Sequence, residues 1–148
     1  MTPMRALHAR LRQEHAELDT ALAQLIQAFE TGDQAIARDA FRAFDQRLSQ
    51  HLRIEDELLL PDFAHVDRAE AELIASDHRT IRAKADELAV GTDLHVARVP
   101  AVRELAELLR RHAKREDEML YRWVEESLAA EEEPVRSPGE PLQPAAPR

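Results

Sequence analysis

Two ten-residue stretches of the sequence repeat the same arrangement of histidine and acidic residues. HLRIEDELLL begins at His51, HAKREDEMLY begins at His112, and both contain His-x-x-x-Glu-Asp-Glu. Residues four apart lie on the same face of a helix, so each stretch would present an imidazole beside a carboxylate. A mixed imidazole and carboxylate set suits iron or manganese. The chain has no cysteine, which excludes thiolate ligands and disulfides.

The elements that carry these stretches are predicted to be helices. Apolar residues recur at spacings of three and four, the helical period, and no alternating pattern typical of a strand is found. The expected helices span about 4–30, 33–64, 68–90 and 99–130. Gly32 and Gly91 are predicted helix stops, Pro100 a helix start, and Pro61 a kink or an end of the second helix. Short connections favour an all-α, up-down-up-down four-helix bundle.

Length and composition limit the organisation and the class of function. The 148 residues fit one domain, which we predict at 1–130, and the proline-rich, charged segment 131–148 is predicted to be a disordered tail. The formal net charge of -9 argues against a nucleic-acid surface. The sequence contains no run of about 18 apolar residues, so no membrane span is expected. The first residues lack an apolar secretory segment, so a cytoplasmic protein is expected.

A polar layer is predicted inside the bundle. Each helix has a histidine within its apolar stripe, and two helices add a glutamate one turn later. The six residues are His15, His51, Glu55, His78, His112 and Glu116. Counting from the loops at about 1.5 Å per residue places all six at one level. Buried carboxylates without partners cost several kcal/mol, so we predict that the six bind two metal ions.

Other polar residues near this layer receive different predictions. Asp56 and Asp117 follow the two glutamates, and each could either accept a hydrogen bond from an imidazole or be solvated. His8 is predicted to lie partly exposed in an end layer of the bundle. His65 and His95 are predicted to be surface residues, whereas Tyr121 and Trp123 are predicted to be packing residues and not redox partners.

These motifs resemble the hemerythrin-like family, the HHE cation-binding domains. The resemblance covers about residues 8–126 and rests on QEHAEL around His15, HLRIEDELLLP, SDHRTI around His78 and HAKREDEML. It implies a four-helix bundle that holds two iron ions joined by an oxo or hydroxo bridge, with manganese as an alternative metal. The resemblance implies that His15 and His51 bind one iron and that His78 and His112 bind the other. It also implies that Glu55 and Glu116 bridge the two irons.

Two departures from the oxygen-carrying members matter. Those proteins have a fifth histidine one turn before the third-helix ligand, where this chain has Ile74. Their second bridging acid lies five residues after its histidine, a position that Asp117 occupies here, but the first half of the chain favours Glu116. The resemblance is therefore to di-iron proteins linked to oxidative and nitrosative stress and to iron-centre repair.

Three functions remain open at this stage. The protein could bind or sense O2 or NO, or handle iron, under oxidative or nitrosative stress. It could instead be a di-iron enzyme that breaks down peroxide or reduces NO. A metal-free helical interaction module is the third alternative, although it leaves the buried glutamates unexplained. The expected partner is a diatomic molecule or peroxide, and the sequence does not identify a redox partner.

Overall fold

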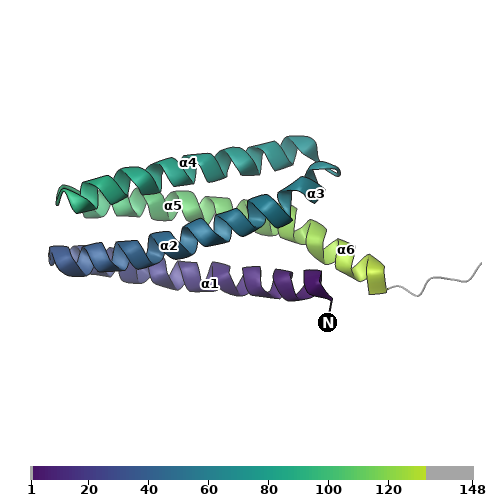
Figure 1. Cartoon of the computed structure of the whole chain (residues 1–148), viewed down its shortest axis with the longest axis horizontal. Coiled ribbons are helices and arrows are strands. Elements are labelled where there is room, and N and C mark those ends of the chain that lie inside the picture. The colour runs from purple at the N-terminus through teal and green to yellow at the C-terminus, as the bar shows by residue number, and fades with distance from the viewer. Residues whose placement is uncertain (1, 133–148) are drawn as a thin grey trace, which may run out of the picture.

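Four long helices form the body of the protein in the computed structural model, which describes residues 2–132. The long helices are α1 (Pro3–Glu30), α2 (Gln34–Leu58), α4 (Arg68–Asp93) and α5 (Val99–Glu116). The shorter elements are α3 (Leu60–Ala64), the π-helix η1 (Asp117–Tyr121) and α6 (Arg122–Glu132). The long helices alternate in direction (Figure 1), and α1 and α4 each pack against α2 and α5. The predicted up-down-up-down bundle is confirmed, whereas the tail predicted at 131–148 lies outside the described residues from 133 on.

Capping side chains and prolines explain where the helices begin. The Thr2 hydroxyl accepts a hydrogen bond from the first turn of α1, and Pro3 occupies that turn. Asp33 accepts two backbone N–H groups of α2, at 3.0 and 3.1 Å, and Asp67 accepts one of α4, at 3.0 Å. Each of these contacts satisfies a backbone donor that the helix itself leaves free. Pro100 lies in the first turn of α5, as predicted.

The predicted helix ends are confirmed in two places and wrong in one. Gly32 follows α1 with φ at 75°, the left-handed conformation that favours glycine. The second predicted helix divides into α2 and α3 at Leu59, and Pro61 lies in the first turn of α3. Gly91, however, does not end its helix, because α4 continues to Asp93. A Cβ at Gly91 would lie 3.4 Å from the Ala97 Cβ, an ordinary van der Waals contact, so the packing of the following loop does not require glycine there.

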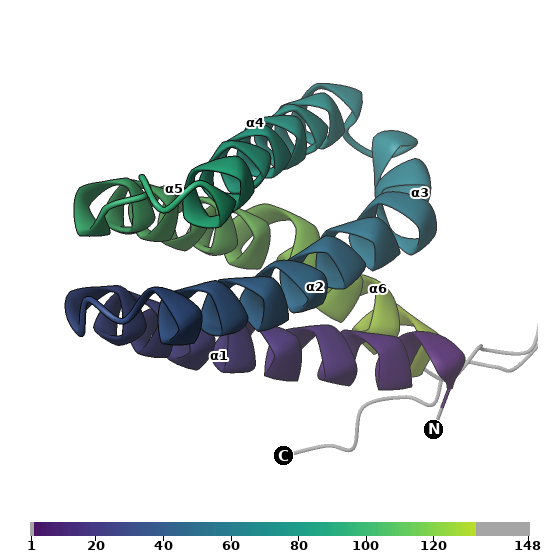
Figure 2. The ribbon, with the colours of Figure 1, turned by 60° about the vertical axis from the view of Figure 1, so that its left-hand side comes forward.

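The fourth predicted helix is not a uniform α-helix. The π-helix η1 follows Glu116 directly, and α6 continues the chain from it. Figures 1 and 2 show α6 leaving the line of α5 toward the N-terminal part of α1, which it contacts. A π-helical turn takes one residue more than an α-helical turn and changes the direction in which later side chains point. This change matters for the site described below.

Two apolar clusters fill the core, the first formed by the four long helices and the second mainly by α1, α3, α4, η1 and α6. The first cluster contains Leu22, Phe41, Phe44, Ile81 and Leu105, and the second contains Leu11, Leu59, Ile74, Leu120 and Tyr121. His15 in α1 and His78 in α4 fall between residues of the two clusters, and His112 and Glu116 fall between Ala106 of the first cluster and Leu120 of the second. The predicted polar layer is therefore sandwiched between two apolar layers. No helix in the described part of the chain is long and apolar enough to cross a membrane.

Candidate metal centre

All six residues predicted at the polar layer come together in the middle of the bundle, and we call them the His/Glu cluster. Their donor atoms form two groups, and within each group the atoms lie within 4.8 Å of one another. The first group is His15, His51, Glu55 and Glu116, and the second is Glu55, His78, His112 and Glu116. Both glutamates belong to both groups. The arrangement could thus hold two metal ions that share the two carboxylates.

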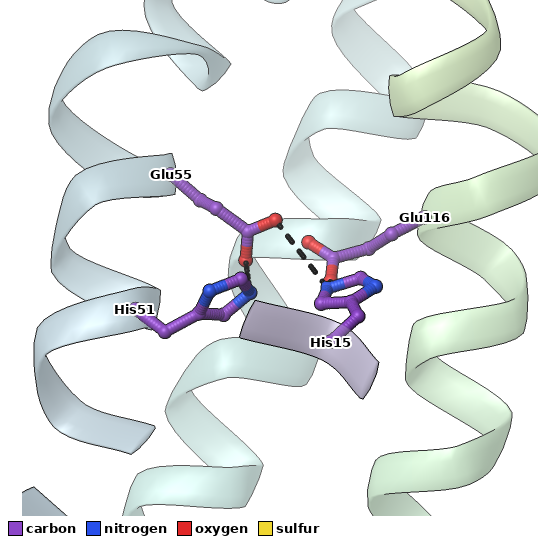
Figure 3. A group of neighbouring side chains, drawn as sticks. All are labelled: His15, His51, Glu55 and Glu116. Carbon is purple, nitrogen blue, oxygen red and sulfur yellow. Dashed lines mark ion pairs between the residues drawn. The ribbon is translucent and has the colours of Figure 1, made fainter. Parts of the chain in front are cut away.

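Glu116 lies at the centre of the cluster, and it is 1% exposed. Its Oε1 lies 3.3 Å from His15 Nε2 and 3.1 Å from His112 Nε2. Its Oε2 lies 3.3 Å from His78 Nε2. Figure 3 shows Glu116 and Glu55 reaching toward each other from α5 and α2, with the rings of His15 and His51 beside them. One carboxylate therefore faces imidazoles from three different helices.

Glu55 is fully buried and contacts both halves of the cluster. Its Oε1 lies 3.2 Å from His51 Nε2 and 3.6 Å from His78 Nε2. Its Oε2 accepts a hydrogen bond of 2.7 Å from the Tyr121 hydroxyl, which also lies 3.0 Å from His15 Nε2. Tyr121 packs in the second apolar cluster, as predicted, and its hydroxyl adds a contact that the sequence reasoning did not anticipate. This side chain is fully buried, but it also holds one carboxylate of the cluster.

The π-helix explains why sequence reasoning missed Tyr121. Tyr121 lies five residues after Glu116, and in an α-helix five residues rotate a side chain roughly 140° away from the first. A π-helical turn pairs residues five apart, so η1 returns Tyr121 to the face that carries Glu116. The sequence contains no simple signal for this turn.

Several donor atoms of the cluster are buried without a hydrogen-bond partner in the described part of the chain. They are His51 Nε2, Glu55 Oε1 and His112 Nε2. Leaving a buried polar atom unsatisfied costs about 1–3 kcal/mol. All three atoms belong to the groups that could hold a metal ion, and imidazole and carboxylate are its suitable ligands. The unsatisfied atoms therefore fit a pair of bound cations.

Carboxylates also face the outer nitrogens of the imidazoles. Glu14 Oε2 lies 2.8 Å from His51 Nδ1, and Asp77 Oδ2 lies 3.1 Å from His112 Nδ1. An Nδ1–H that donates to a carboxylate leaves the Nε2 lone pair directed at the centre. The sequence reasoning missed both acids. Their signal is that Glu14 and Asp77 each immediately precede a histidine of the cluster, once in each half of the chain.

The two acids that follow the glutamates differ in their contacts. Asp56 Oδ1 lies 2.6 Å from His78 Nδ1, and Asp56 Oδ2 accepts a hydrogen bond of 2.6 Å from Arg82. Of the two alternatives left open for Asp56, the hydrogen bond to an imidazole is the one that the structure shows. Asp117 Oδ1 lies 3.6 Å from His15 Nδ1, which is an ion-pair distance but not a hydrogen bond. We call Glu14, Asp56, Asp77 and Asp117 the outer acids.

A comparison with protein families decides which family these features represent. The family model for the hemerythrin HHE cation binding domain matches residues 6–124, which include the whole His/Glu cluster. The chain belongs to the hemerythrin HHE cation-binding family. No curated protein and no solved structure matches the chain. The resemblance seen in the motifs is confirmed.

Burial and ion pairing change the acidity of the imidazoles in this HHE domain. Burial by itself lowers the pKa of His51, but the close ion pairs with Glu55 and Glu14 outweigh it and raise the pKa to about 9. Burial likewise lowers the pKa of His78, and its bonds to Asp56 and Glu116 raise the pKa to about 9. Without metal, both histidines therefore bind a proton at neutral pH.

The two glutamates of the HHE domain respond to this environment in opposite ways. Burial raises the pKa of Glu55, and the charge of Glu116 raises it further. Burial also acts to raise the pKa of Glu116, but its close ion pairs with His112, His15 and His78 outweigh it and lower the pKa well below its usual range. Glu116 therefore carries the more persistent negative charge of the metal-free cluster.

The remaining histidines of the HHE domain lie outside the cluster. His8 is half-buried, and its Nε2 lies 3.2 Å from Glu125 Oε1, in agreement with the predicted end-layer position. His65 and His95 are exposed, as predicted. Trp123 packs against the second apolar cluster, as predicted.

Proposed function

We propose that this HHE domain binds two iron ions through the His/Glu cluster and uses them to bind or sense O2 or NO under oxidative or nitrosative stress. The observation that carries the proposal is that two groups of potential ligands share both Glu55 and Glu116. A single metal ion would not need two such groups. Manganese remains the alternative metal because it accepts the same ligands.

The charges around the cluster support bound cations over a metal-free interaction module. Four outer acids surround the imidazoles, and Glu55 and Glu116 add two further carboxylates at the centre. In the metal-free protein, protons on His51 and His78 offset part of this charge. Two divalent cations would replace those protons and would use the unsatisfied donor atoms. A packing role alone requires neither the charge nor the unsatisfied atoms.

The number of protein ligands supports a role in small-molecule binding. Each group offers two imidazoles and one oxygen of each glutamate, so four protein atoms face each ion. An ion that prefers about six ligands would keep positions for a solvent bridge and an exogenous molecule. Bound iron would supply the electrons and the open coordination positions that O2 or NO requires. The residues of the chain hold the metals, orient the imidazoles and exclude bulk water.

Ile74 supports a stress-related role over reversible oxygen carriage. It is fully buried and occupies the position of the fifth histidine that the resemblance assigns to oxygen carriers. An isoleucine cannot coordinate, so each metal would have two histidines. The two metals would then be more nearly alike than those of an oxygen carrier, and both would keep a position for NO.

Iron analysis and NO titration test this proposal together. Protein purified without air and supplied with ferrous iron is expected to contain two irons per chain. Titration of that protein with NO should alter its spectrum until NO and iron are bound in comparable amounts. A folded protein that binds at most one iron would contradict the two-metal proposal, and a two-iron protein that ignores NO would contradict the sensing role.

A further inference from the structure

The two groups of the His/Glu cluster differ only in their imidazoles, because both glutamates belong to both groups. We call the group with His78 and His112 the α4/α5 position, and the group with His15 and His51 the α1/α2 position (Figure 3). Each position offers a metal ion two imidazoles and two carboxylate oxygens. Any difference in affinity between the positions therefore comes from how the imidazoles are held.

Both imidazoles of the α4/α5 position are held by an acid at the outer nitrogen. His78 Nδ1 lies 2.6 Å from Asp56 Oδ1, and His112 Nδ1 lies 3.1 Å from Asp77 Oδ2. Arg82 donates a 2.6 Å hydrogen bond to the second oxygen of Asp56, so this carboxylate is fixed from two sides. An imidazole held in this way keeps its Nε2 directed at the centre and loses little freedom when a metal binds.

The α1/α2 position has such a contact at only one of its imidazoles. His51 Nδ1 lies 2.8 Å from Glu14 Oε2, whereas His15 Nδ1 and Asp117 Oδ1 are 3.6 Å apart. Among residues 2–132, neither of these last two atoms has a hydrogen-bond partner, although both are buried. Of the four histidines in the cluster, His15 is thus the one whose outer nitrogen is not held by an acid.

The hydrogen on the His15 ring explains the missing contact. The Tyr121 hydroxyl has one hydrogen and donates it to Glu55 Oε2, so toward His15 Nε2, 3.0 Å away, its oxygen can only accept. His15 Nε2 therefore carries a hydrogen. The 3.6 Å gap to Asp117 shows that Nδ1 donates none, so the ring turns an N–H and not a lone pair toward the centre. Metal binding at this position requires the other tautomer of His15.

Burial and charge increase the difference between the positions. His78 is 0% and His112 is 4% exposed, whereas 14% of the His15 side chain is exposed. A carboxylate beside an imidazole attracts protons as well as metals, but a divalent ion carries twice the charge of a proton and gains more from it. The α4/α5 position has two carboxylates hydrogen-bonded to its imidazoles, and the α1/α2 position has one.

We propose that the two positions bind metal in order: the α4/α5 position holds the first divalent ion, and the α1/α2 position holds a second, exchangeable one. Loss of one outer partner of a metal ligand costs about 10–100-fold in affinity, which sets the expected difference. The source of the difference is the missing hydrogen bond at His15. This inference rests on the proposed function for the presence of two metals. It would allow the protein to release one iron ion while it keeps the other.

Anomalous X-ray diffraction locates the first metal directly. The full-length protein is loaded without air with one equivalent of ferrous iron per chain and is then crystallised. One equivalent divides about 3:1 between the positions if their affinities differ about tenfold, and about 10:1 if they differ about a hundredfold. The excess is expected at the α4/α5 position. Equal occupancy, or an excess at the α1/α2 position, would overturn the inference.

Two matched variants test the cause. Asp56→Asn and Asp117→Asn change the acids that follow the two glutamates, but only Asp56 forms a hydrogen bond with an imidazole. In competition with a chelator, Asp56→Asn is expected to weaken binding of the first ferrous ion by about tenfold or more, and Asp117→Asn to change it by less than about threefold. Asp77→Asn replaces Asp56→Asn if that variant does not fold. Equal effects of the two variants would refute the role of the outer acids.

Removal of iron from the two-iron protein completes the test and separates the inference from the proposed function. A dilute chelator is expected to take one iron per chain before the other, and crystals of the half-depleted protein should keep the metal of the α4/α5 position. Loss of both irons in a single step contradicts the order of binding and leaves the two-iron proposal intact. A folded protein that never binds a second metal contradicts the proposed function and, with it, the exchangeable position.

Discussion

Replacing Tyr121 with phenylalanine would remove a single hydroxyl group from the centre of the protein. That hydroxyl donates a 2.7 Å hydrogen bond to Glu55 Oε2, and both side chains are fully buried. Phenylalanine keeps the ring and its packing in the second apolar cluster. The substitution therefore isolates the hydrogen bond from the apolar contacts.

The expected cost follows from the charge and the burial of the acceptor. A hydrogen bond to a charged group contributes about 1.5–3 kcal/mol, and a buried acceptor that loses its donor is not rescued by water. Burial and the charge of Glu116 raise the pKa of Glu55, so metal-free protein at low pH should lie at the lower end of this range. For a chain of this size, we expect the melting temperature to fall by roughly 5–12 °C.

A double-mutant cycle measures the interaction directly. Tyr121→Phe, Glu55→Gln and the double variant are unfolded with urea in the metal-free state at one pH. Because the two side chains are in contact, a coupling energy of about 1–2 kcal/mol is expected. Trp123→Phe serves as the control, because it also alters an aromatic residue of the same apolar cluster but lies outside the His/Glu cluster. Its effect should add to that of Glu55→Gln.

Additive effects would refute this reasoning. If Tyr121→Phe and Glu55→Gln combine within about 0.5 kcal/mol, the hydroxyl does not hold the carboxylate in solution. A second readout comes from the iron-loaded protein, in which Tyr121→Phe should lower the affinity for iron because Glu55 loses its orienting contact. Unchanged stability together with unchanged iron affinity would return Tyr121 to the role of a packing residue.

Three further predictions concern the metals and the protons that compete with them. Combined replacement Glu55→Gln and Glu116→Gln should preserve the helical circular dichroism spectrum but reduce iron binding below two ions per chain; full binding would show that the bridging ligands are misassigned. Asp77→Asn should weaken metal binding by about 10–100-fold in competition with a chelator, because it removes the acid that faces an imidazole of α5. The pKa values of His51 and His78 are raised from an ordinary 6.5 to about 9. Proton binding by these two histidines therefore stabilises the metal-free protein fully below pH 6.5, and this contribution is lost as the pH rises through 9. Metal binding must displace the same protons, so the gain in melting temperature on adding metal should grow from pH 6.5 to 9, and a constant gain would contradict the pKa values.

The sequence by itself determined the bundle and the members of its polar layer. The helical period of the apolar residues specifies which face of each helix is buried, and Gly32 and Pro100 mark two of the boundaries. Histidines at matching distances from the loops must then meet at one level, because the rise per residue of a helix is constant. The outer acids Glu14 and Asp77 were also within reach of sequence reasoning, since each precedes a histidine of the cluster in its half of the chain.

Gly91 shows where local rules fail. Glycine often ends a helix because it adopts left-handed dihedral angles without strain. Here the helix continues to Asp93, Gly91 does not adopt the left-handed conformation, and a Cβ there would make only an ordinary van der Waals contact with Ala97. Whether a glycine ends a helix depends on the path of the loop after it, and that path is set by how α4 and α5 pack.

Only the tertiary structure decided the position of Tyr121 and the existence of a cavity of about 50 Å³ beside the His/Glu cluster, between α1, α2 and α5. A five-residue spacing from Glu116 points away from the centre in an α-helix, and the π-helix that reverses this is a local departure from the regular period. The cavity is bounded by side chains from three helices that are distant in the sequence. Its volume is what remains after all three have packed, so no periodicity within any single helix can predict it.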